Sequence, residues 1–326
     1  MRRRLLVRVT AAGLGALLVA ASAHAYVRSR TSKDNTPLAW TGNCAYLTPD
    51  SAVTPDVTAE EATAAITASA AAWNAPSCTY FELKIDPPEA GGKAVMERPT
   101  GMNFIVFRQD SWCPPDPEEP CYDSNATALT TVFYIDKPGD DQNGRILDAD
   151  VELNNINFGF TVDGTRPPGS EGKLGVADVQ NTVTHELGHL LGLDHTCYDG
   201  WNPCEDDWQC KTNGLSCRTE DDCIPLDDKG VRIPRCTDVL SPEVTEATMF
   251  NYASSLDTSK RDLTQDDIDG VCGIYPLAAD PGRCSRVDTS GDNGCATVAG
   301  RAPTGAGLAA LAALALLVAL ARRRRP

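Results

Sequence analysis

Histidine is scarce in this sequence. The 326 residues include four histidines, and one of them, His24, lies in an N-terminal segment that we expect to be removed. The other three, His185, His189 and His195, fall within residues 185–195. Imidazole is the commonest metal ligand among side chains, so the lack of spare histidines excludes a second histidine-rich metal site elsewhere.

Positive charge is also scarce. The chain has 29 Lys and Arg against 45 Asp and Glu, and nine of the basic residues lie in the terminal stretches 1–25 and 295–326, which contain no acidic residue. The intervening part therefore carries a formal charge of about −25. Such an acidic surface argues against nucleic acid or anionic membrane as its partner. It leaves carboxylates for Ca²⁺, or for a solvated acidic loop; the candidates are Asp136, Asp140, Asp141 and Asp150.

Closely spaced cysteine pairs of the C-x₂-C type are absent, which excludes a zinc finger. Thirteen cysteines are present, and setting Cys295 aside leaves twelve, enough for six disulfides in an exported chain. Their pairing cannot be read from the sequence. Cys113 and Cys121 predict a disulfide-closed surface loop, and the six cysteines within residues 197–236 predict a stapled insertion.

Both ends of the chain have the layout of targeting segments. Three arginines, an apolar run over residues 11–21 and a cleavage site at 23–25, with small residues at its first and third positions, predict a signal peptide over residues 1–25. A membrane anchor would need a longer apolar run. At the other end, Gly294 and Cys295 precede a second apolar run, residues 308–321, and an arginine cluster.

The part between these ends mixes strands and helices without a βαβ rhythm or a repeat, which favours an α+β domain. We expect a polar leader over residues 26–37, one domain over 38–277 and a linker over 278–294. The expected strands are 38–47, 78–85, 102–107, 128–135 and a half-exposed 145–154; the expected helices are 58–74, 178–191 and 264–274, and 159–174 is expected to be a loop.

The stretch 185–195 reads HELGHLLGLDH. On a helix, His185 and His189 lie one turn apart on the same face, and Gly192 can end the helix so that His195 returns to the same point. Three imidazoles leave a fourth tetrahedral position open on zinc, as in catalytic sites. An amphipathic helix with histidines on its polar face is the alternative, but the full pattern in a histidine-poor chain favours one catalytic Zn²⁺.

Glu186 lies beside that open position. A carboxylate there can accept a proton from a zinc-activated water and later pass it to a leaving amine. This pattern therefore predicts a hydrolase.

The pattern HExxHxxGxxH, followed by the methionine-containing segment 247–252, resembles the metzincin zinc endopeptidases. That resemblance places Met249 in the turn beneath the metal. Thr196 after the motif, and the segment 263–276 with its capping-box residues Thr264 and Asp267, are most similar to the matrixin branch. The resemblance implies a zincin-like mixed twisted sheet, with the strand at 146–154 as the edge along which a substrate pairs.

The sequence departs from the matrixin pattern in three ways. No cysteine-switch pro-region fits before residue 38, and the histidines of a second, structural zinc are missing. Cys44 is expected to be disulfide-bonded instead. Tyr252 follows Met249 by three residues, which favours a place near the specificity pocket over metal binding.

The C-terminal segment 295–326 resembles a MYXO-CTERM-like sorting tail, which implies processing and lipid attachment at Cys295 by sorting machinery. An uncleaved membrane anchor is the alternative. Either tail would place the domain outside the cytoplasmic membrane, at the cell surface or released.

We therefore expect a secreted or surface-anchored zinc endopeptidase acting on proteins or peptides. Two alternatives stay open. One is a Cys-rich adhesion module whose zinc is structural, and the other is a zinc hydrolase acting on a non-peptide bond. Glu186 distinguishes the first of these, because a closed structural site needs no carboxylate beside it.

Overall fold

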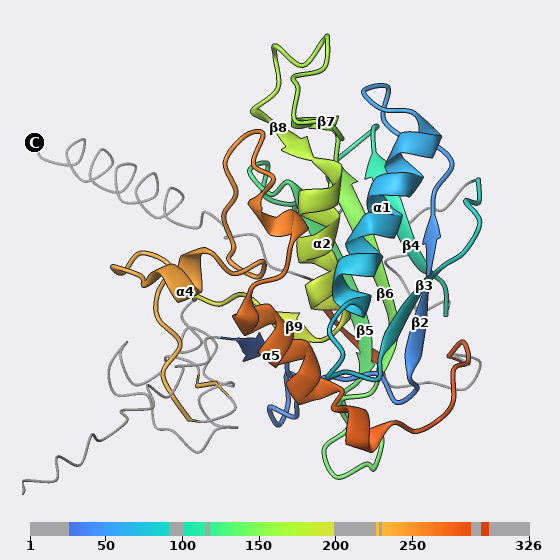
Figure 1. Ribbon diagram of the computed structural model, residues 1–326, viewed down its shortest axis with the longest axis vertical. Coiled ribbons are helices and arrows are strands. Elements are labelled where there is room, and N and C mark those ends of the chain that lie inside the picture. Colours follow the sequence, from blue (N-terminus) through green and yellow to red (C-terminus); the bar gives the residue numbers. More distant parts are fainter. Residues whose placement is uncertain are drawn as a thin grey trace, which may run out of the picture.

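The computed structural model describes residues 26–90, 101–114, 118–198, 226–227 and 230–287, together with the backbone of 295–299 (Figure 1). The predicted signal peptide, most of the predicted cysteine-rich insertion and most of the predicted C-terminal tail lie outside these residues. No helix within the described part is long and apolar enough to cross a membrane.

A six-stranded mixed sheet forms the centre of the domain, in the order β10-β5-β6-β4-β2-β3. Four strands run parallel to one another, whereas β5 and β10 are antiparallel to their neighbours. The bounds are β2 Cys44–Pro49, β3 Glu82–Ile85, β4 Asn103–Arg108, β5 Ala128–Ile135, β6 Ile146–Asn154 and β10 Cys295–Ala299. Five of these strands match predicted ones, although β2 and β3 begin later than expected, whereas β10 was not predicted and lies in the segment expected to be a sorting tail.

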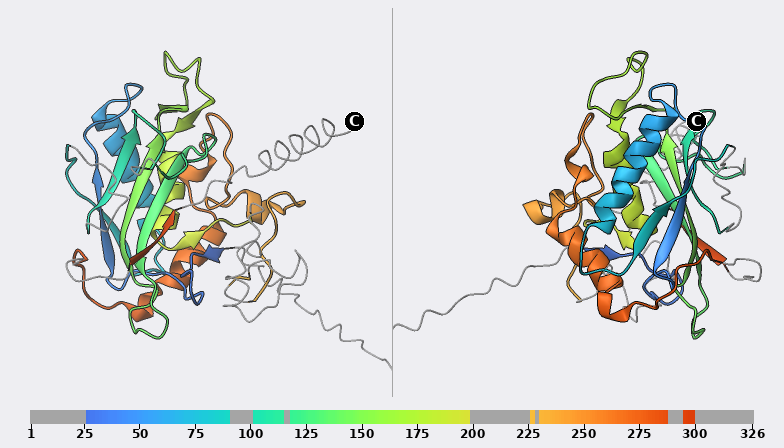
Figure 2. Two further views of the ribbon diagram at one scale, coloured as in Figure 1. Left: turned by 180° about the vertical axis from the view of Figure 1, so that it is seen from behind. Right: turned by 45° about the vertical axis from the view of Figure 1, so that its right-hand side comes forward.

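Two helices, α1 (Ala59–Asn74) and α2 (Val179–Leu190), pack side by side against one face of the sheet (Figures 1 and 2). The start of α1 is fixed by a capping box in which Thr58 and Glu61 bind each other's backbone N–H groups. At its other end Trp73 is buried and its indole donates to the carbonyl of Thr184 in α2, at 2.8 Å. The predicted helix 58–74 is therefore confirmed, and its last turn anchors α2.

The strand β6 is buried along its whole length, so the prediction that it would be half exposed was wrong. Its alternate residues Ala149, Val151 and Leu153 belong to the core under the helices. The acidic residues between them face the other side, where main-chain N–H groups bind Asp148 and Asp150, and Arg108 pairs with Glu152 at 2.9 Å. Charge compensation lets an alternating strand be covered on both faces.

The edge of the sheet also differs from the prediction. The strand β6 lies inside the sheet between β4 and β5, so it cannot be the edge along which a substrate pairs. The strand β5 lies next to β6 on that side of the sheet, and β10, antiparallel to β5, is the outermost strand.

The N-terminal segment, which we expected to be a polar leader, is part of the domain. The short strand β1 (Val27–Arg28) pairs with β9 (Leu193–Asp194), directly before His195. Ser29 adds two hydrogen bonds to this region, from its N–H to the carbonyl of Gly192 and from its hydroxyl to that of Leu193. Hydrophobicity alone gave no signal for this pairing, because it is made by backbone groups.

Four disulfides are present in the described residues: Cys44–Cys284, Cys78–Cys272, Cys113–Cys121 and Cys197–Cys236. The predicted disulfide-closed loop and the predicted bond of Cys44 are confirmed. So many disulfides indicate folding in an oxidising compartment. The remaining elements are β7 Phe158–Thr161, β8 Gly175–Asp178, α4 Pro242–Thr245, η2 Ser259–Arg261, α5 Gln265–Ile274 and η3 Leu277–Ala279. The strand β7 includes the first residues of the segment 159–174, so the prediction of a loop was wrong at that end.

Candidate metal centre

The helix α2 carries the histidine motif, and both of its ends are fixed. At the start, the Asp178 side chain accepts from the N–H of Asn181 at 2.9 Å and also pairs with Arg261. After Leu191 the chain turns at Gly192, which has a φ of +94°. A Cβ on Gly192 would lie 2.8 Å from the carbonyl oxygen of Leu38, so both conformation and space require glycine there.

The turn at Gly192 brings the three histidines together. The Nε2 atom of His195 lies 3.2 Å from Nε2 of His185 and 3.2 Å from Nε2 of His189. Zinc bound to imidazoles at 2.0–2.1 Å in a tetrahedron requires ligand nitrogens about 3.3 Å apart. The donor set and its spacing therefore fit a zinc ion, and these histidines form the one cluster of three or more metal-ligating side chains in the described residues.

Backbone carbonyl groups orient two of the rings. Nδ1 of His185 lies 2.6 Å from the carbonyl oxygen of Thr248, and Nδ1 of His189 lies 3.0 Å from that of Leu193. A carbonyl only accepts, so each Nδ1 must carry the proton. Each Nε2 then presents a lone pair toward the common point, which is the tautomer that metal binding requires.

The surroundings disfavour protonation of the cluster. Burial is the main cause that holds the pKa of His185 well below its usual value, and Lys260 and the other two histidines add to it. Burial likewise lowers the pKa of His195, with contributions from His189 and Lys260. Neutral rings are the form that binds a metal ion.

Glu186 is buried beside the histidines, 5% exposed. Its Oε2 accepts a hydrogen bond from the Thr130 hydroxyl of β5 at 2.6 Å. Burial raises the pKa of Glu186, while His189 and Thr130 oppose that shift. A fixed carboxylate with a raised pKa can both take up and release a proton.

The predicted methionine turn lies under α2. A Cβ on Gly188 would meet the Met249 sulfur at 2.1 Å, so Met249 packs against the helix between His185 and His189. Asp267 holds this turn, since its carboxylate accepts from the N–H groups of Thr248 and Met249 at 2.9 and 3.2 Å. Asp267 is also the predicted capping-box residue of α5, so one buried side chain fixes both features.

Two contributors were missed by sequence reasoning. Thr130 lies in an ordinary strand pattern, and nothing local marks it as the partner of Glu186. Lys260 is buried, donates to the carbonyl of Phe250 and reaches within 3.4 Å of Nδ1 of His185. Burial lowers its pKa to about 8. No spacing rule links Lys260 to the motif, because the contact forms through the fold.

In the described residues, the other predicted ligands do not belong to this cluster. Of the calcium candidates, Asp136 accepts from Ser32 and Asp150 from the N–H of Phe104, and none joins a group of three ligands in the described residues. Tyr252 is 65% exposed. The side chain of Cys295 lies outside the described residues.

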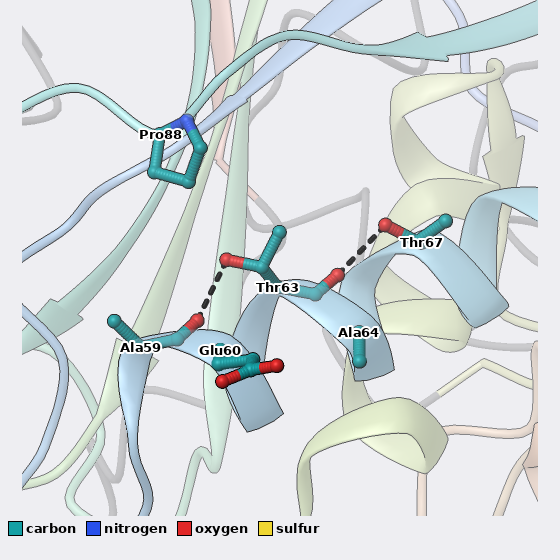
Figure 3. Close-up of a pocket in the computed structure, with 6 residues that line it drawn as sticks. All are labelled: Ala59, Glu60, Thr63, Ala64, Thr67 and Pro88. Carbon is teal, nitrogen blue, oxygen red and sulfur yellow. Dashed lines mark hydrogen bonds between the residues drawn. The ribbon is translucent and has the colours of Figure 1, made fainter.

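A hollow of about 550 Å³ lies on the outer side of α1, against Pro88 (Figure 3). Its threonines, Thr63 and Thr67, donate their hydroxyls to helix carbonyls, as the dashed lines show. The hollow therefore presents mostly apolar surface, and none of the histidines lines it.

No protein-family model matches the chain, and no curated protein does. Among solved structures, the structure of myroilysin aligns with a TM-score of 0.32 and 13% sequence identity, covering 73% of this chain and 82% of that chain. The function must therefore be argued from the site itself.

Proposed function

We propose that this protein is an exported zinc endopeptidase in which His185, His189 and His195 bind one catalytic Zn²⁺ and Glu186 is the general base. The main support for this proposal is the buried Glu186 carboxylate, which lies beside three imidazoles whose Nε2 atoms converge. A site closed by four protein ligands would leave such a carboxylate without purpose. The metzincin-like, matrixin-type motif of residues 185–195 with Met249 supports the same assignment.

In this mechanism the protein supplies orientation and proton transfer. When bound, zinc lowers the pKa of a water molecule and polarises the scissile carbonyl. Thr130 holds Oε2 of Glu186, so Oε1 is the oxygen that takes the proton of the attacking water and later gives it to the leaving amine. The carbonyls of Thr248 and Leu193 keep two histidine rings in place throughout.

Two rival functions make different demands on the site. A Cys-rich adhesion module with a structural zinc does not need Glu186 for binding, so the carboxylate favours an enzyme. A zinc hydrolase acting on a non-peptide bond would use the same groups. Protein hydrolysis is therefore the measurement that separates the proposal from both.

The test is casein hydrolysis by the purified protein, with and without 1,10-phenanthroline. We expect activity that the chelator abolishes and added Zn²⁺ restores. Glu186→Gln should lower kcat by about 10²–10⁴-fold while one zinc per chain is retained, because the lost group transfers protons and binds no metal. Undiminished hydrolysis by Glu186→Gln would rule out this mechanism.

A second variant separates orientation from proton transfer. Thr130→Val keeps the shape of the side chain but removes the hydrogen bond to Glu186, so we expect a smaller loss of kcat, about tenfold, which corresponds to about 1.4 kcal/mol. Thr131→Val is the matched control, since it makes the same change at the next position of β5, where the side chain points to the opposite face of the sheet. Zinc content and circular dichroism should be unchanged in both variants.

The proposal extends to location. Residues 1–25 would direct export, and processing with lipid attachment at Cys295 would tether the protein at the cell surface. Mass spectrometry of protein purified from cells tests this, because an intact arginine cluster at residues 322–325 would contradict processing.

A further inference from the structure

The segment after the domain returns to the sheet as a sixth strand. Residues Cys295–Ala299, β10, pair antiparallel with β5 in a continuous register from Cys295 opposite Ile135 to Ala299 opposite Thr131 (Figure 2, red beside green). Without β10, the outer side of β5 would be an unpaired edge, and such edges accept an extended chain readily.

This edge leads to the metal centre. Thr131, the last residue that β10 covers, is the chain neighbour of Thr130, whose hydroxyl binds Glu186. One residue of strand corresponds to about 3.3 Å. An extended peptide that reaches Glu186 along β5 must therefore pair with the backbone next to β10, and to extend further it must use the positions that β10 holds.

We propose that, in the chain before processing at Cys295, β10 occupies the substrate-pairing edge of β5 and so restrains access of extended peptides to the metal centre. The inference rests on the proposed peptidase function, and β10 is the named occupant of the edge.

The short connection from Val287 to Cys295, called the tether below, explains how so short a strand can stay paired with β5. Cys284 is bonded to Cys44 of β2, and Val287 packs against the core, so the chain to β10 starts from a fixed point. A short tether raises the effective concentration of its end to about 1 mM. At that effective concentration, a dissociation constant of only about 0.1 mM for the pairing of β10 with β5 would reduce the fraction of molecules with a free edge about tenfold.

The test compares two double variants of the full chain. Thr297→Pro with Val298→Pro removes two consecutive backbone N–H donors, so one of them must be a donor to β5 whichever way the strand faces. Thr297→Val with Val298→Thr exchanges the two side chains and keeps every backbone donor, so it is the matched control.

Hydrogen exchange reads the pairing directly. We expect the edge-facing amides of residues 131–135 to exchange at least tenfold faster in the proline variant, and at the original rate in the exchange control. On a fluorogenic peptide, kcat/KM should rise about tenfold or more in the proline variant only. Unchanged hydrogen exchange would overturn the pairing, and faster exchange with unchanged kcat/KM would overturn the restraint.

A binding measurement separates this inference from the proposed function. A fluorescein-labelled peptide of residues 294–300 should bind the proline variant in the Glu186→Gln background at least tenfold more tightly than the parent chain. This readout needs no catalysis, so it stays informative if no peptide is cleaved. Equal binding to both proteins would overturn the inference even in an active enzyme.

Discussion

Glu152 shows how the protein handles a charge that its fold buries. The side chain is fully buried in β6 and is paired with Arg108 at 2.9 Å. Burial nevertheless dominates and raises the pKa of Glu152 to about 7, against the lowering effect of Arg108. Arg108 also donates to the carbonyl groups of Ser111 and Cys113, so its guanidinium group is shared between these carbonyls and the carboxylate of Glu152.

This shift predicts a pH dependence of stability. The folded pKa of Glu152 lies above the unfolded value of 4.5, so between pH 4.5 and about 7 the folded protein keeps a proton that the unfolded chain releases. Stability should therefore fall as pH rises through this interval, by up to about 3 kcal/mol from this group.

Urea unfolding at pH 5 and pH 8 checks this prediction. Glu152→Gln should lose that share of the pH dependence, whereas the exposed control Glu171→Gln should behave like the parent protein. The same pH dependence in Glu152→Gln and in the parent would show that the burial of this carboxyl is not costly.

At the residue scale, the sequence predicted that His185, His189 and His195 would lie together with Glu186 beside them, because all four fall within one short stretch, residues 185–195. The groups that orient them come from elsewhere. Thr130, Lys260 and the carbonyl of Thr248 approach the histidines from other segments. A pattern in one stretch of sequence carries no information about such partners.

At the scale of elements, α2 and the methionine turn fit together at one glycine. The space that a Cβ on Gly188 would need is taken by Met249 and by the ring of Trp73, at 2.1 and 3.1 Å. Gly188 lies between His185 and His189, so any displacement of the helix here moves both histidines.

Gly188→Ala should therefore lower the free energy of unfolding by about 1–3 kcal/mol through overpacking. We also expect weaker zinc binding in a chelator competition, because the ligands on either side shift. Gly172→Ala, at a position with open space, is the control.

A double-mutant cycle with Met249→Ala makes this test specific. Removing the methionine side chain makes room for the new methyl group, so Gly188→Ala should cost less in the Met249→Ala background. Strictly additive costs would show that the contact with Met249 is not the cause.

The elements themselves were largely predictable, since capping residues and periodicity are local signals. The helix 58–74 and the strand β5 illustrate this. The position of β6 inside the sheet, its double-sided burial and the pairing of β1 with β9 were not predictable. They depend on which strands become neighbours, and single-sequence periodicity does not encode neighbours.

At the scale of the whole molecule, two disulfides tie distant parts of the chain together. Cys44–Cys284 spans 240 residues and Cys78–Cys272 spans 194, so they join the first strands to the end of the domain. A third, Cys113–Cys121, spans only 8 residues. Constraint of the unfolded chain grows with the length of the loop that is closed.

We expect Cys78→Ala with Cys272→Ala to lower the free energy of unfolding by about 4 kcal/mol, since Cys44–Cys284 already shortens the loop that it closes. Cys113→Ala with Cys121→Ala should cost about 2.5 kcal/mol. Guanidinium unfolding under non-reducing conditions measures both. The reverse order would show that strain or local packing outweighs chain entropy.

The disulfide Cys197–Cys236 has a consequence of a different kind. Its two Cα atoms are 5.0 Å apart, and Tyr198 binds the backbone of Pro234 and Cys236 just beyond it, so the excursion leaves and rejoins the domain at nearly one point. Closing a longer loop costs only slightly more entropy than closing a shorter one. The disulfide therefore marks a site, two residues beyond His195, where the enclosed sequence can vary in length and composition at little cost to the stability of the domain.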